Sequence, residues 1–167
     1  MKPLFAVVVA SIPVVAWTAG SSPDEQFFED AAESGIAIVS DANLAKKRSS
    51  NAAITNFVDR TLKDQTAAND KLQSLAASEM VDLPGHPGLK QRAEHAKLDL
   101  VDANSFDRQY VEGQIKALRE AIMLYEQEAA SGRDPKAQDY AKEMLPMLKS
   151  RLEQARKLAA RTGANVS

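Results

Sequence analysis

Apolar and small residues recur at alternating steps of four and three along the middle of the chain. In residues 51–78 the pattern consists of Ile54, Val58, Thr61, Gln65, Ala68, Leu72 and Leu75. Residues three and four positions apart share one face of a helix, so the pattern predicts a long helix from about Asn51 to Ser78 with one inward seam. Two members of this seam, Thr61 and Gln65, are polar.

The same spacing predicts four further helices. They run from about Pro23 to Lys47, from Leu89 to Leu100, from Ser105 to Gly132 and from Pro135 to Gly163. Ser22, Pro23 and Glu25 are typical of a helix start, because Ser caps, Pro fits the first turn and Glu completes a capping box. Two prolines and two glycines in "VDLPGHPG" predict the loop before the short helix.

The segment that most resembles a β-strand is "AVVVASIPVVA", and it belongs to the apolar segment at the N-terminus. We therefore predict an all-α fold, an antiparallel four-helix bundle with one additional short helix that covers one end. The length of 167 residues suits a single domain of this kind, spanning residues 21–167.

The first twenty residues resemble a secretory signal peptide. Lys2 supplies a positive charge, and a nearly continuous apolar run follows from Leu4 to Ala19. This run is shorter than the roughly 20 apolar residues that a membrane span needs. We favour a cleaved signal peptide, residues 1–20, over an uncleaved inner-membrane anchor. The mature protein is then periplasmic or secreted and keeps no stable membrane span.

Composition restricts the classes of partner and chemistry. The chain has no cysteine, so disulfides and lipid attachment through a thiol are excluded, and packing alone must stabilise the exported domain. The formal net charge of −2 gives no electrostatic reason to expect a nucleic-acid partner. A protein partner in the cell envelope is the class that remains.

The sequence carries no recognisable catalytic motif. A carboxylate–histidine metal site in a four-helix bundle needs Glu-x-x-His, and this spacing is absent from the chain. His86 lies in the proline-rich loop, and His95 follows Glu94 on the short helix, where adjacent side chains point in different directions. Nucleophile elbows and phosphate-binding loops are also absent. We expect no cofactor, no metal and no enzymatic activity.

Three polar residues fall on seams of three different long helices. Gln65, Gln114 and Arg151 are each flanked by apolar seam positions, and Asp64 is the nearest acid that might pair with Arg151. Burying an amide or a guanidinium without partners costs several kcal/mol, so these groups should find each other or a ligand. Two alternatives remain open: the seams are displaced by one position and the groups reach water, or they form a structural network that fixes the bundle register.

At these residues the chain resembles a known family, the bacterial exported domain-of-unknown-function family 4142, which has a ferritin-like helical bundle. The resemblance covers nearly the whole mature chain and rests on four segments. They are "FFEDAAESGIAIVSDANLA" (27–45), "SSNAAITNFVDRTLKDQTAANDKLQSLA" (49–76), "SFDRQYVEGQIKALRE" (105–120) and "DYAKEMLPMLKSRLEQARKLA" (139–159). It implies a ferritin-like bundle in the cell envelope and supplies no activity.

The chain departs from the family at the inward polar positions. Relatives typically carry an Asp-His pair where this chain has Asp64-Gln65, and histidines at the positions of Gln114 and Arg151. A Glu is common in relatives at the position of Ile38. Because a guanidinium repels a metal cation and cannot ligate one, the resemblance implies a variant that has lost any metal centre its relatives have.

These observations favour a non-enzymatic exported helical bundle that acts in binding or in envelope maintenance under stress. One alternative is a ferritin-like metal-binding or oxidoreductase protein, which the missing histidines oppose. The other is a small-anion binding module, with Arg151 as the anchor and the Gln65 and Gln114 amides as donors.

Overall fold

The computed structural model describes residues 22–165, and the predicted signal peptide lies outside these residues. The described chain forms five helices and no strand: α1 (Pro23–Arg48), α2 (Ala52–Ser78), α3 (Leu89–Asp99), α4 (Ala103–Ser131) and α5 (Pro135–Thr162). The predicted all-α fold of four long helices and one short helix is confirmed. No helix in this part of the chain is both long and apolar enough to cross a membrane.

Local capping determines where the helices begin. At α1 the Ser22 hydroxyl accepts from the Glu25 N–H at 3.1 Å, and the Glu25 carboxylate accepts from the Ser22 N–H at 2.7 Å. At α4 the Asp102 side chain accepts from two backbone N–H groups, so the helix begins at Ala103, two residues before the predicted start. Gly163 ends α5 with a φ of 68°, a left-handed conformation that glycine adopts without strain.

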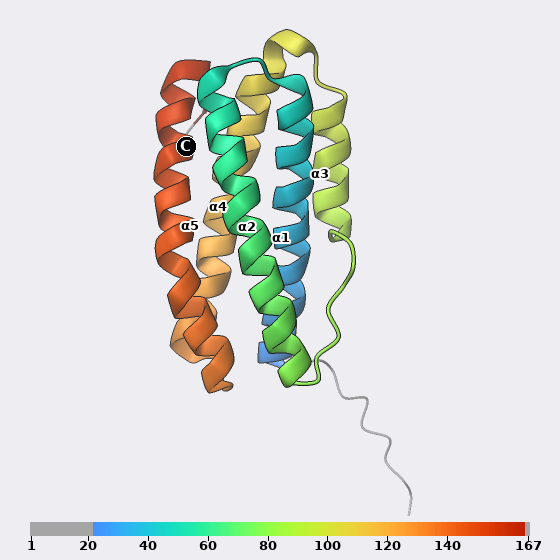
Figure 1. Ribbon diagram of the computed structural model, residues 1–167, viewed down its shortest axis with the longest axis vertical. Helices are drawn as coiled ribbons and strands as arrows, with labels where there is room; N and C mark the ends of the chain where they lie inside the picture. The colour runs from blue at the N-terminus through green and yellow to red at the C-terminus, as the bar shows by residue number, and fades with distance from the viewer. Residues whose placement is uncertain (1–21, 166–167) are drawn as a thin grey trace, which may run out of the picture.

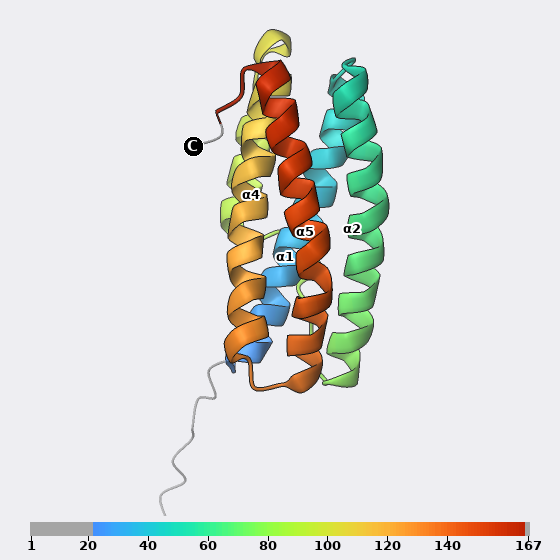
Figure 2. The same cartoon turned by 90° about the vertical axis from the view of Figure 1, so that its left-hand side faces the viewer.

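The four long helices form two antiparallel hairpins, α1 with α2 and α4 with α5 (Figures 1 and 2). The connection between the hairpins returns along the length of the bundle, so that α4 starts at the end opposite to the one where α2 finishes. As a result α1 and α4 are neighbours and also run antiparallel. The short helix α3 lies in this connection, outside the bundle, against α1 and α4. It therefore runs along the side of the bundle, and the prediction that it covers one end is wrong.

Aromatic side chains fill the core toward the two ends of the bundle. Phe27 packs edge-on against Tyr125 with ring centroids 5.1 Å apart, and Tyr140 lies next to both. Phe106 stacks on Tyr110 toward the opposite end. The interior between these clusters holds polar side chains. They include Gln65, near the middle of α2, and Arg151, past the middle of α5.

The short helix α3 has no buried side chain, which sets it apart from the four long helices. Arg48 binds the C-terminal end of α3 by donating hydrogen bonds to the carbonyl oxygens of Leu98, Asp99 and Val101. The Arg48 guanidinium also lies 4.4 Å from the centroid of the Phe106 ring. Polar contacts thus position α3 on the bundle, together with the partly buried Leu98, which packs against the core.

Candidate functional site

Three of the four predicted site residues lie inside the bundle. Gln65, Gln114 and Arg151 are 4%, 1% and 4% exposed, as their seam positions require. Asp64 is exposed, because one residue along a helix turns the side chain by about 100° away from the face of Gln65. The expected pairing of Asp64 with Arg151 is not seen, and Asp64 acts on the guanidinium only through its charge.

Arg151 hydrogen-bonds to neutral partners. Its Nη1 donates to Gln65 Oε1 at 2.7 Å, and its Nη2 lies 2.9 Å from the Met147 sulfur. Within the described residues Arg151 forms no salt bridge with a carboxylate. Burial lowers the pKa of the guanidinium, and the charge of Asp64 partly opposes this. The bundle therefore holds a desolvated cation whose direct protein partners carry no charge.

Gly35 of α1 makes room for the amide that faces Arg151. Gln65 Nε2 donates to Asn69 Oδ1 at 2.9 Å, which fixes the orientation of the Gln65 carbonyl toward the guanidinium. A Cβ at Gly35 would lie 2.2 Å from Asn69 Oδ1 and 3.1 Å from Gln65 Nε2. The positions of the Asn69 and Gln65 side chains against α1 therefore depend on a glycine at residue 35, although glycine weakens a helix interior.

The facing helix α4 contributes two buried polar atoms without a hydrogen-bond partner in the described structure, the Tyr110 hydroxyl and Gln114 Oε1. They lie one helical turn apart on the same face. Burial raises the pKa of Tyr110 well above its usual range, and the charge of Asp41 raises it further, so the hydroxyl stays protonated. We call Gln65, Asn69, Tyr110, Gln114 and Arg151 the polar layer.

The polar layer does not fit a metal ion. Amides, a phenol and a guanidinium offer weak donors or a positive charge, where transition metals take imidazole, thiolate or carboxylate. Nowhere in residues 22–165 do three His, Cys, Asp or Glu side chains lie close enough together to hold a metal.

A second feature, absent from the sequence prediction, is a groove of about 560 Å³ between α1, α3 and α4. Small and aliphatic side chains line it, among them Ala37, Ile38, Ala117, Ala121 and Leu124. Polar side chains surround this apolar floor: Asp30, Ser34, Asp41, Gln91, Glu94, Lys97, Gln109, Glu112, Lys116 and Glu120.

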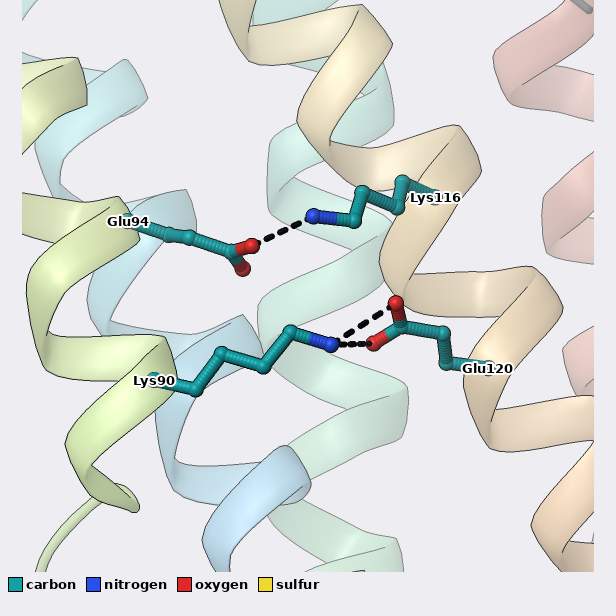
Figure 3. A network of polar contacts seen from close by, with 4 residues as sticks. All are labelled: Lys90, Glu94, Lys116 and Glu120. Atoms are coloured by element: carbon teal, nitrogen blue, oxygen red, sulfur yellow. Dashed lines mark hydrogen bonds and ion pairs between the residues drawn. The ribbon is translucent and has the colours of Figure 1, made fainter.

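Ion pairs join α3 to α4 beside the groove (Figure 3). Lys90 reaches both carboxylate oxygens of Glu120 at 2.9 Å, and Lys116 binds Glu94. The four side chains extend toward one another from facing helices. The order Lys-Glu on α3 meets Lys-Glu on the antiparallel α4, a complementarity that sequence spacing reveals only once the two helices are known to be neighbours.

A histidine–carboxylate contact joins α3 to α1. His95 Nδ1 lies 2.6 Å from Asp41 Oδ1, with both side chains partly buried. Burial raises the pKa of Asp41, while the hydrogen bond from His95 opposes the rise. The sequence pattern places His95 beside Glu94 on the short helix and does not reveal Asp41 as its partner, because Asp41 and His95 are far apart in sequence.

The chain matches one known protein family. The sequence model of one family, described as "Domain of unknown function (DUF4142)", matches residues 10–158. No curated protein and no solved structure matches the chain.

Proposed function

Because the chain belongs to the DUF4142 family, whose description states no activity, we propose from its own geometry that it is an exported, ferritin-like bundle that binds a small molecule and catalyses no reaction. The signal-like residues 1–20 support export. The single long crossover between the two hairpins is the connectivity that ferritin-like bundles use, which supports that assignment.

The groove between α1, α3 and α4 is the observation on which the binding function rests. Its volume of about 560 Å³ falls within the range of small-molecule sites, roughly 300–1,000 Å³. It also has the composition of such sites, an apolar floor with polar groups around it. Because α3 has no fully buried side chain and packs on the core mainly through the partly buried Leu98, a shift of α3 to admit a ligand would disturb few apolar contacts.

Three carboxylates around the groove are engaged in ion pairs. Glu94 is bound to Lys116, Glu120 to Lys90, and Asp41 to His95. Paired groups of this kind orient α3 and shape the groove, whereas general acid–base catalysis needs a group held ready for a proton of the substrate. This arrangement supports binding over catalysis.

Filling the groove tests the binding function. The neutral fluorescent probe N-phenyl-1-naphthylamine is expected to bind the wild-type protein with increased fluorescence, because the floor is apolar. Ala117→Phe and Gly113→Leu place bulk in the groove, and a Cβ at Gly113 meets no atom within 4 Å. Each is expected to weaken probe binding by about tenfold or more, in fluorescence titrations.

The matched control is Ala67→Phe, which adds the same bulk at an exposed position of α2 outside the groove. It should bind the probe as the wild type does, and circular dichroism should show all variants folded. Undiminished probe binding by both filled variants, or no binding by the wild type, would exclude the groove as the ligand site.

A small anion held by Arg151 is a second candidate function, favoured by the desolvated guanidinium without a carboxylate partner. We propose that Nε of Arg151 and the Tyr110 hydroxyl are donors for such an anion. The Gln114 side chain becomes a further donor if its amide group is flipped by 180°, because the amide oxygen and nitrogen are nearly the same in size.

Thermal unfolding in different sodium salts distinguishes this candidate from a structural contact. Chloride is expected to raise the melting temperature relative to the bulkier gluconate at equal ionic strength, and Arg151→Met should abolish the difference. The melting temperature shift reports anion binding to the folded state. If the chloride effect persists in Arg151→Met, the anion does not bind at Arg151.

A further inference from the structure

The groove has an elongated shape. Its lining follows α4 from Gln109 to Leu124, which is roughly 22 Å of helix at about 1.5 Å per residue. Ala37, Ala117 and Ala121 form much of the floor, and Gly113 adds open space because nothing lies within 4 Å of the position of its missing Cβ. An extended, narrow aliphatic chain fits this surface, and each methylene placed there contributes about 0.8 kcal/mol when fully buried.

Negative charge predominates along the groove. Five carboxylates line it, from Asp30, Asp41, Glu94, Glu112 and Glu120, against the two ammonium groups of Lys97 and Lys116. Three of these carboxylates are held by His95, Lys116 and Lys90. The field inside the groove therefore favours a cationic ligand over an anionic one.

The remaining two carboxylates lie toward opposite ends of the groove. Asp30 is in the first third of α1 and Glu112 in the first third of α4, and these helices run antiparallel. Asp30 accepts from Gln26 Nε2 at 3.0 Å, and Glu112 accepts from the backbone N–H of Asn165 at 2.9 Å. Neither forms an ion pair in the described part of the chain. Each keeps acceptor positions for an ammonium group.

We propose that the groove between α1, α3 and α4 binds a linear aliphatic amine with two or more ammonium groups. The methylene chain lies along the alanine floor, one terminal ammonium binds Asp30, and another binds Glu112. The helix α3 covers the chain through its ion pairs to α4. This inference rests on the proposed binding function and names its ligand class.

A bare divalent cation has the charge but not the aliphatic chain, and an alkyl diol has the chain but not the charge. These two probes therefore test separately whether the charge and the aliphatic chain are needed for binding. Isothermal titration calorimetry of the purified protein in 0.15 M NaCl, about physiological ionic strength, is expected to show binding of spermine and of 1,8-diaminooctane. Binding of 1,8-octanediol is expected to be about tenfold weaker or undetectable, and Mg²⁺ should not displace the diamine.

Isosteric substitutions test whether the carboxylates of Asp30 and Glu112 bind the ammonium groups. Asp30→Asn and Glu112→Gln are each expected to weaken diamine binding by about threefold, and together by about tenfold, the range for partly exposed ion pairs. Asp70→Asn removes an exposed acid from α2, outside the groove, and should leave the affinity unchanged. Each of these substitutions preserves side-chain shape, and the three positions are exposed or half-buried, so folding is expected to persist.

The outcomes separate the ligand class from the binding function. If the diol binds as tightly as the diamine, the amine proposal is wrong while a groove that binds apolar molecules stands. If Asp70→Asn weakens diamine binding as much as Asp30→Asn and Glu112→Gln do, the amines bind by general charge attraction and the proposed site is excluded. If neither the amines nor N-phenyl-1-naphthylamine bind, both proposals fail.

Discussion

At pH 8 the variant Glu128→Gln is expected to be more stable than the wild-type protein by about 2–3 kcal/mol, and at pH 4.5 the two should be nearly equal. Glu128 is only 4% exposed near the end of α4, and its Oε1 has no hydrogen-bond partner in the described structure. A Cβ at Gly132 would lie 2.1 Å from this oxygen, so the carboxyl is folded against the turn into α5.

The environment of Glu128 opposes its ionisation. Burial contributes most and the neighbouring Asp24 and Asp134 carboxylates add to it, and together they raise its pKa from a usual value of 4.5 to about 7. Burial also opposes the ionisation of Asp24, but hydrogen bonds outweigh it and lower the pKa of Asp24. The donors are the backbone N–H groups of Arg133 at 2.6 Å and Asp134 at 3.2 Å. Asp24 therefore stays ionised at pH 4.5 and above.

The sign of the effect follows from the raised pKa of Glu128. Below pH 4.5 the carboxyl is protonated in both the folded and the unfolded chain, so folding carries no electrostatic cost there. As the pH rises to about 7, the unfolded chain loses the proton while the folded chain retains it, and the free energy of unfolding falls. The difference between the usual pKa of 4.5 and the folded-state pKa of about 7 limits this loss to about 3 kcal/mol.

Urea denaturation at pH 4.5, 6 and 8 measures this effect directly. Glu126→Gln provides the control, because Glu126 lies on the same helix but is exposed and pairs with Lys149 at the surface. Its loss should cost less than about 1 kcal/mol at neutral pH. Equal stability differences between Glu128→Gln and the wild type at all three pH values would show that Glu128 is not the titrating group.

The second large effect on stability is expected from removing the hydrogen bond between Gln65 and Arg151. Gln65→Leu removes the carbonyl that accepts from Arg151 at 2.7 Å and leaves a buried guanidinium with the Met147 sulfur as its remaining partner. Hydrogen bonds to charged groups contribute about 1.5–3 kcal/mol, and an unpaired buried charge is costlier still. We therefore expect Gln65→Leu to lose about 3 kcal/mol of stability, measured by urea denaturation in gluconate buffer.

The reciprocal substitution is expected to cost much less. Arg151→Met removes the desolvated cation and replaces it with an apolar side chain of similar length, so its stability should lie within about 1 kcal/mol of the wild type. The double variant, Gln65→Leu with Arg151→Met, leaves neither group unpaired and should recover most of the loss. A loss in Arg151→Met as large as that in Gln65→Leu would instead identify Arg151 as a net stabilising residue.

The helical architecture was predictable because every long helix carries a continuous seam and a recognisable start. The inward placement of Gln65, Gln114 and Arg151 followed from the same spacing, since 3.6-residue periodicity fixes the direction of a side chain whatever its chemistry. The burial of Glu128 was not predicted, because an acidic residue near the end of a helix normally indicates a solvated face.

The groove was not predictable from the sequence pattern. Its floor consists of residues such as Ala117 and Ala121 that resemble ordinary packing positions on a helix. It exists because α3 lies outside the bundle, held by Lys90, Glu94 and His95, and charged residues on an amphipathic helix normally indicate a solvated face.

The absence of buried side chains in α3 has a consequence for how the molecule opens. Regions with few apolar contacts unfold locally at a small fraction of the global free energy. The segment from Glu79 to Asp102 is therefore expected to detach at a lower free-energy cost than either hairpin, a cost set by its polar contacts and by the core packing of Val81, Leu83, Leu98 and Val101. Such local opening would expose the surfaces of α1 and α4 beneath α3 to solvent repeatedly during the lifetime of one folded molecule. The bundle would thus behave as a rigid four-helix frame with one independently exchanging cover.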